Sequence, residues 1–294
     1  MRPGQPGYDT ARVTENPRYN DARPLAVLTA ASAADVSAGL VFARQHGVPL
    51  ALRSGGHSYP GWSSGGARGT GMPPSLVIDT RGMTDIALGP NNTATIGAGA
   101  SLADVYSTLG NHGRALAAGS CATVGVTGLT LGGGVGVLVR AYGLTSDALT
   151  ELEIVTADGA VRTVNAKENA DLFWACQGGG GGHLGVVTRL TFATPDAPGV
   201  TMFYLVWPWQ AAASVIDAWQ SWAPTADPRL WSTLKLLGGA SHAGGPGVFL
   251  SGTWIGRQGD LTGQLAPLLR RVGTPPDVND AYTRDYRDAM LAYA

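Results

Sequence analysis

The chain has 294 residues, of which 44% are hydrophobic and 14% are charged, and its formal net charge is −1. This composition is typical of a folded globular protein with a lightly charged surface, and the length allows two domains with cores of their own. Because Lys and Arg form no block, neither nucleic acid nor an anionic membrane is expected as a partner.

The first elements along the chain predict a strand–helix–strand unit. A strand is expected at Leu25–Thr29, and a helix begins after Ser32, which forms a capping-box pattern with Asp35. His46-Gly47 ends that helix, and a second strand follows at 48–53. We expect a βαβ unit with a right-handed crossover.

Further strands and helices follow, separated by Gly, Pro and capping residues. We expect strands at 75–80, 93–98, 185–194, 201–207, 230–237 and 247–255, a hairpin over 149–165, and helices at 101–109, 168–176, 209–222 and 260–271. Pro195 and Pro198 mark a boundary, beyond which the chain is rich in tryptophan and predicts a second α+β domain. The C-terminal "DYRDAMLAYA" is typical of an unfinished helix.

Signals for targeting, metal binding and disulfides are few. No apolar run is long enough to cross a bilayer, and the N-terminus carries no signal-peptide core. A cytoplasmic location is therefore favoured, with a secreted mature form left open. Cys121 and Cys176 lie in no metal-ligand spacing, and no metal is expected. A single bridge between these two cysteines stays open.

The segment "RSGGHSY" (53–59) leads from a strand into two glycines and a histidine. Gly55 and Gly56 allow positive φ and close approach of another group. Loops of this kind expose backbone N–H groups that bind anions, phosphate above all. His57 would lie at the edge of such a site, although a histidine there is more often only a hydrogen-bonded loop residue.

Two more glycine clusters follow. "GGGHLG" (180–185) satisfies G-x-G-x-x-G, but it follows a helix and opens a strand, which excludes a nicotinamide-binding Rossmann unit. The cluster over 117–147 offers a surface without side chains on which a planar ring and a diphosphate could pack. Cys121 precedes a helix expected from about Thr127, a position that favours the thiolate. The alternative for Cys121 is a small buried apolar residue.

Together these motifs carry a family resemblance. "RSGGHSY", "GSCATVGVTG", "LGGGVG", "YGLTSD" and "DLFWACQGGGGGHLGVVT" occur in the order found in FAD-linked oxidases of the vanillyl-alcohol oxidase superfamily. From about residue 17 to its end, the chain most closely resembles the berberine bridge enzyme-like branch, which includes glucooligosaccharide oxidases. The resemblance implies an α+β fold with a two-subdomain FAD-binding domain at 17–197. An N-terminal extension would occupy 1–16, and an incomplete α+β substrate domain 200–294.

The resemblance also implies a doubly attached FAD. His57 would bond to the 8α-methyl of the flavin and Cys121 to its carbon 6. Val124 would be the oxygen-permissive residue of this branch, and Tyr59, on the same side as His57 if the backbone is extended, a candidate wall of the substrate site. The other expected cofactor contacts are Arg53, Ser54, Gly55, Gly56 and Ser58 at the pyrophosphate, Gly119, Ser120, Gly125 and Gly128 beside the flavin, and Gly185 and Val187 near the adenosine.

The implied reaction is an oxidation. Hydride would pass from a substrate carbon bearing oxygen to FAD while a base takes the hydroxyl proton, and dioxygen would reoxidise the flavin to give hydrogen peroxide. The substrate would be a small molecule such as a sugar, an alcohol or a secondary metabolite.

Several features depart from the family's pattern. The family's chain usually continues further and carries a tyrosine base that "DYRDAMLAYA" does not match. We therefore assign no catalytic residue in this chain and expect an incomplete substrate wall. We also expect weak FAD binding and slow or no turnover. Gln177 and His183-Leu184 also differ from the family's common residues.

Other functions stay open. They are an FAD-dependent reductase with a non-covalent flavin, a non-catalytic flavin-binding protein, and a carbohydrate-binding module built on tryptophans. We expect these tryptophans in the second domain's core, although Trp207 or Trp254 could face a substrate. The set comprises Trp207, Trp209, Trp219, Trp222, Trp231 and Trp254.

Overall fold

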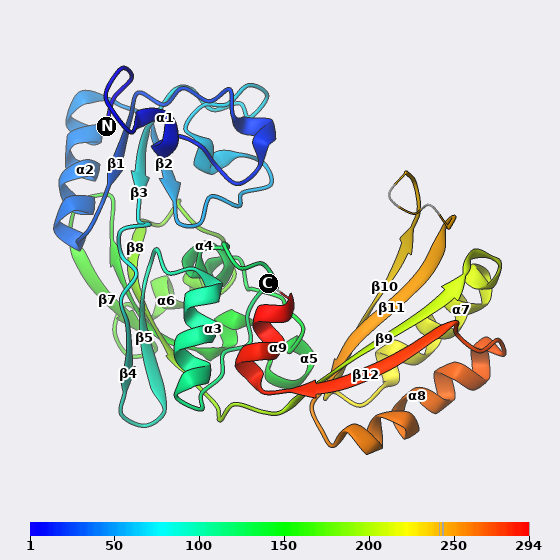
Figure 1. Ribbon diagram of the computed structural model, residues 1–294. Coiled ribbons are helices and arrows are strands. Elements are labelled where there is room, and N and C mark those ends of the chain that lie inside the picture. Colours follow the sequence, from blue (N-terminus) through cyan, green and yellow to red (C-terminus); the bar gives the residue numbers. More distant parts are fainter. Residues whose placement is uncertain (241, 243, 294) are drawn as a thin grey trace.

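The computed structural model describes residues 1–240, 242 and 244–293, and its fold is α+β (Figure 1). Within these residues the strands form three sheets with three, five and four members. Within the described residues, no helix has both the length and the apolar character needed to cross a membrane. The described part of the chain also contains a first helix and five short 3₁₀ helices outside the main elements: α1 (Tyr8–Ala11), Pro17–Tyr19, Trp62–Ser64, Thr145–Ala148, Trp209–Ala211 and Ala223–Thr225.

The first sheet is parallel, in the order β1 (Ala26–Thr29), β3 (Leu76–Asp79), β2 (Leu50–Arg53). The helix α2 (Ala33–His46) packs against it. The predicted cap is confirmed, because the Ser32 hydroxyl accepts the Asp35 N–H at 3.2 Å. Gly47 ends α2 at φ +62°, as expected.

The second sheet is antiparallel, and the predicted 149–165 hairpin lies at one edge of it. Gly159 turns that hairpin at φ +85°. Four helices of this part of the chain pack about the same core, and α3 begins where the Ser101 hydroxyl accepts the Asp104 N–H. The strand order is β4 (Ile86–Gly89), β5 (Thr93–Gly97), β8 (Val186–Ala193), β6 (Leu149–Val155), β7 (Val161–Asn165), and the helices are α3 (Leu102–Asn111), α4 (Val126–Leu131), α5 (Val139–Tyr142) and α6 (Ala170–Cys176).

The third sheet is antiparallel and is covered on one face by two helices, α7 (Ala212–Trp222) and α8 (Gln258–Val272) (Figure 1). Its strand order is β10 (Leu230–Leu237), β11 (Gly247–Trp254), β9 (Val200–Pro208), β12 (Val278–Arg284).

The tryptophans divide between core and surface. Trp207 and Trp254 are 0% and 1% exposed, and they lie with Trp222 in the core between the third sheet and its helices. The expectation of a core role is confirmed for these three. The alternative that Trp207 or Trp254 faces a substrate is wrong, because packing leaves neither ring accessible. Trp209, by contrast, is exposed.

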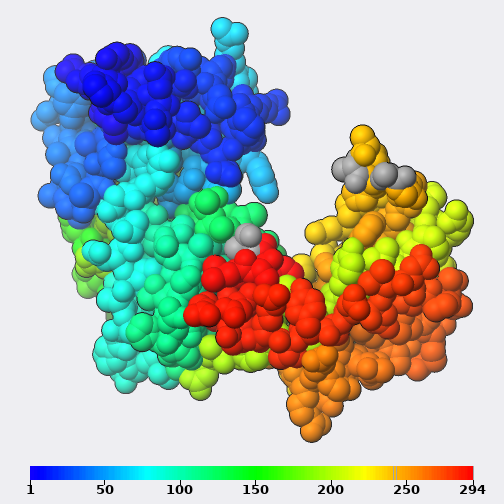
Figure 2. Space-filling view, in the orientation of Figure 1, coloured from blue at the N-terminus to red at the C-terminus, as the bar shows by residue number. Residues whose placement is uncertain are grey.

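After β12 the chain returns to the second sheet's part of the molecule, where α9 (Tyr286–Tyr293) lies beside α3 (Figure 1). The buried Tyr286 hydroxyl donates to the Leu116 carbonyl at 2.8 Å and accepts the Leu116 N–H at 3.0 Å. Burial raises the pKa of Tyr286, so the phenol stays neutral and keeps both bonds. The helix α9 therefore anchors the segment that leads into Gly119 and Cys121. Figure 2 shows an open hollow between the N-terminal half and the third sheet, with α9 below it.

Candidate functional site

The histidine loop, Ser54–His57, begins where β2 ends. Gly56 adopts φ +79°, a conformation that favours glycine, and its carbonyl accepts the Glu15 N–H at 3.3 Å. The Ser54 hydroxyl donates to the Ala98 carbonyl at 2.8 Å. The loop is thus held on one side by the N-terminal segment and on the other by the residue that follows β5.

The histidine loop and the cysteine loop, Gly119–Gly125, are in direct contact. A Cβ on Gly55 would lie 2.1 Å from the Gly125 nitrogen, and one on Gly125 would lie 2.2 Å from the Gly55 nitrogen. Backbone therefore packs on backbone, which no residue other than glycine allows at either position. His57 Nε2 lies 2.9 Å from the Thr123 hydroxyl oxygen, within hydrogen-bond distance. The two predicted flavin loops are brought together by these contacts.

Cys121 is an exposed free thiol. Its loop is fixed from beneath by α3, because the Leu102 and Ala103 N–H groups donate to the Val124 and Ala122 carbonyls, each at 3.0 Å. Tyr106, buried on α3, donates its hydroxyl to the Gly119 carbonyl. Cys121 is therefore a surface group on a rigid support, and the alternative of a buried apolar residue is wrong.

Cys176 is the buried cysteine, and its surroundings are apolar. It is also a free thiol, so the structure contains no Cys121–Cys176 bridge. Burial raises the pKa of Cys176. This thiol is a core residue, as expected.

The glycine cluster at 180–185 approaches the same region. The Gly180 N–H donates to the Leu131 carbonyl at 2.7 Å, at the end of α4. A Cβ on Gly182 would lie 3.5 Å from the Leu52 side chain, at the end of β2. Gly185 packs its α-carbon against the Val155 carbonyl, where a Cβ would come within 2.5 Å. Val187 lies in the core beneath, where its side chain is buried.

The other predicted cofactor residues range from buried to exposed. The Arg53 side chain is fully buried and points into the protein, so the part of Arg53 in a phosphate site would be limited to its backbone. Burial lowers the pKa of Arg53 to about 10, and the Asp79 carboxylate opposes that shift. Ser58 accepts the Trp62 N–H at 3.2 Å. The Tyr59 side chain is 90% exposed.

The residues present fit an FAD. An exposed thiol and a half-exposed imidazole lie on adjoining loops, and these are the nucleophiles that a doubly attached flavin requires. Beside them Ser120 is exposed, and Gly128 has no atom within 4 Å of where a Cβ would be, which leaves open surface for a planar ring. Among the described residues, no group of His, Cys, Asp and Glu is arranged to hold a metal ion.

Two features of the site were not predicted from the sequence. Thr123, the partner of His57, lies within the quoted "GSCATVGVTG", but nothing in that motif marks it as a contact. The contact of Glu15 with Gly56 places the end of the 1–16 segment against the site, although this segment was expected only as an extension.

Comparison with known proteins supports the cofactor. Residues 24–165 match the protein family described as FAD binding domain. The uncharacterized FAD-linked oxidoreductase YvdP of Bacillus subtilis (strain 168) is 37% identical over 292 residues, which cover 98% of this chain and 62% of that protein.

Solved structures agree over the whole chain. BBE-like 1 of Physcomitrella patens superposes with a TM-score of 0.89 at 30% identity, covering 100% of this chain and 62% of that one. Glucooligosaccharide oxidase from Acremonium strictum gives 0.87 at 28% identity, covering 100% and 60%. The chain thus spans about three fifths of the length of these relatives. The chain therefore contains an FAD binding domain, and over its whole length it is similar to berberine bridge enzyme-like and other FAD-linked oxidoreductases.

Proposed function

We propose that this chain forms the flavin-binding part, and part of the substrate-binding sheet, of an FAD-dependent oxidase. The FAD is attached to both His57 and Cys121. The substrate is an alcohol or a sugar, and dioxygen is the final electron acceptor.

The observation that carries this proposal is the contact between the two loops. Gly55 and Gly125 pack backbone to backbone, and His57 lies within hydrogen-bond distance of Thr123, two residues beyond the exposed Cys121. One ring system lying across these loops would reach both nucleophiles. The solved glucooligosaccharide oxidase from Acremonium strictum carries a 6-S-cysteinyl, 8α-N1-histidyl FAD, which is the same pair of attachments.

The uncovered face of the third sheet supports the proposal of a substrate site. Along β9 the side chains of this uncovered face alternate with those of the core, and Tyr204 is one of the side chains on the uncovered face. The Tyr204 and Phe249 rings are 6.0 Å apart on neighbouring strands, with the Ser251 backbone opposite Tyr204 in the register. Aromatic rings interspersed with hydroxyl groups suit a ligand with both apolar and polar faces, such as a sugar.

Each group of this chain has a defined part in the proposed chemistry. FAD, when bound, supplies the hydride acceptor and passes the electrons to dioxygen. The two attachments hold the cofactor in an open site, where loss by dissociation would otherwise be easy. The backbone packing at Gly55 and Gly125, together with the Tyr106 bond to Gly119, keeps both attachment points in fixed positions.

Acid precipitation after incubation with FAD tests the proposal. Flavin absorbance should stay with the precipitated protein, and it should still do so in each single variant, His57→Ala and Cys121→Ser. It should be released completely from the double variant, because both bonds are then missing. Complete release from the unchanged protein would instead indicate a non-covalent flavoprotein, such as a reductase.

A further inference from the structure

We propose that Asp79, Arg53 and Arg81 are positioning residues for flavin attachment at His57. They hold the N-terminal segment Ala11–Glu15 against the histidine loop, and so set the direction in which His57 faces. The effect on flavin attachment rests on the proposed function, whereas the contacts of these three residues do not depend on it.

The cluster is centred on Asp79, a carboxylate at the end of β3 that is 1% exposed. Arg81 forms a bidentate ion pair with it, in which Nε lies 3.0 Å from Oδ1 and Nη2 lies 2.5 Å from Oδ2. Arg53 Nη1 lies 3.6 Å from the same Oδ2. A buried carboxylate requires such partners, and two guanidinium groups in one place require a carboxylate between them.

Both arginines then bind the N-terminal segment. Arg53 Nη1 donates to the Ala11 carbonyl at 2.5 Å, and its Nη2 donates to the Arg12 carbonyl at 3.2 Å. Arg81 Nη2 donates to the same Ala11 carbonyl at 3.1 Å. Arg53 Nε is engaged as well, with the Ser63 carbonyl at 3.0 Å. The Arg53 guanidinium is therefore committed to protein groups rather than facing a ligand.

The segment held in this way reaches the histidine loop. Four residues after Ala11, the Glu15 N–H donates to the Gly56 carbonyl at 3.3 Å. That carbonyl immediately precedes His57, so movement of the segment changes the peptide that orients the imidazole. The Thr80 N–H, between Asp79 and Arg81, donates to the Arg53 carbonyl at 2.8 Å, which joins the cluster to the start of the same loop.

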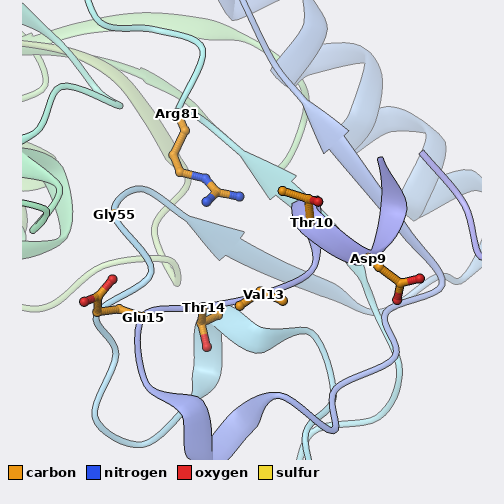
Figure 3. Close-up of a pocket in the computed structure, with 7 residues that line it drawn as sticks. All are labelled: Asp9, Thr10, Val13, Thr14, Glu15, Gly55 and Arg81. Atoms are coloured by element: carbon orange, nitrogen blue, oxygen red, sulfur yellow. The ribbon is translucent and has the colours of Figure 1, made fainter. Parts of the chain in front are cut away.

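A pocket lies between the segment and the start of the histidine loop. It has a volume of about 490 Å³ and is lined by Val13, Thr14 and Glu15 of the segment, by Asp9 and Thr10 before it, and by Gly55 and Arg81. In Figure 3, Arg81 points into the space bordered by Thr10, Thr14 and Glu15. The arginine bonds act beside other contacts of the segment, since Ala11 also packs against the first sheet and the Arg12 side chain donates to the Asn20 and Ala22 carbonyls.

Arg81→Ala is the direct test, because Arg81 is partly exposed and its loss should leave the fold intact. In the flavin-free chain, we expect amide hydrogen exchange over 54–59 to become roughly three- to tenfold faster, with a smaller change over 119–125, because α3 also holds that loop. After loading with FAD, the share of flavin attached to His57 should fall about tenfold, and attachment at Cys121 should stay within about twofold. Arg81→Lys, which keeps the charge beside Asp79, should restore part of both effects.

Asp227 and Arg229 provide a matched control. They have the same spacing of two residues and form the same bidentate ion pair, in which Arg229 Nη2 lies 2.7 Å from the Asp227 carboxylate. This pair lies in the part of the chain that forms the third sheet. Arg229→Ala should change neither exchange over 54–59 nor the distribution of attached flavin. Unchanged exchange in Arg81→Ala, or equal loss of both attachments, would overturn the inference. Absence of covalent flavin from the unchanged protein would contradict the proposed function alone, since the exchange result still decides the role of the cluster.

Discussion

Gly55→Ala is expected to separate the histidine and cysteine loops and to prevent double attachment of the flavin. The added methyl carbon would lie 2.1 Å from the Gly125 nitrogen and 2.7 Å from the Thr123 carbonyl oxygen. Both are backbone atoms, so no side-chain rotation relieves the overlap. We expect destabilisation of about 1–3 kcal/mol, measured by thermal or urea unfolding. The share of doubly attached flavin should fall about a hundredfold, because a displacement of 1 Å can cost that much.

Gly263→Ala is the control for this substitution. Gly263 lies on the exposed side of α8, and a Cβ there would meet nothing within 4 Å. Alanine should stabilise the helix by about 0.5–1 kcal/mol and leave flavin attachment unchanged. If Gly55→Ala behaved like Gly263→Ala, the close approach of the two loops would not exist in the protein.

Trp207→Ala is expected to destabilise the third sheet and its helices by about 3–5 kcal/mol. The indole is fully buried, and its N–H donates to the Thr274 carbonyl at 2.9 Å, which is left without a partner in the variant. Unfolding in urea, followed by tryptophan fluorescence, measures the change.

Trp209→Ala gives the comparison, because Trp209 is close in sequence but 45% exposed. Its unfolding free energy should change by no more than about 0.5 kcal/mol. A small effect at Trp207, combined with weaker binding of a sugar, would favour the carbohydrate-platform interpretation instead.

Locally determined features could be predicted from the sequence. Ser32 and Ser101 mark the starts of α2 and α3, since each capping hydroxyl accepts a bond from the backbone N–H three residues further on. Asp158-Gly159 marks the 149–165 hairpin in the same way. The flavin loops were recognised because several motifs agree in order, not because any single one is specific.

Features that depend on distant parts of the chain could not be predicted. The strands β4 and β12 lie at sheet edges with most of their side chains exposed, so they lack the alternation that marks a strand. Contact between Gly55 and Gly125 joins residues far apart in sequence. Asp79 and Arg81 have the spacing of an ordinary surface ion pair, and only the fold shows that Asp79 is buried.

A mass spectrum of the tryptic digest after loading with FAD tests the central claim most directly. Trypsin releases His57 in the peptide 54–68 and Cys121 in the peptide 115–140. We expect one species with the combined mass of both peptides and a single FAD, which requires His57 and Cys121 to have reached the same ring. Two separate peptides, each without flavin, would contradict this account of the site.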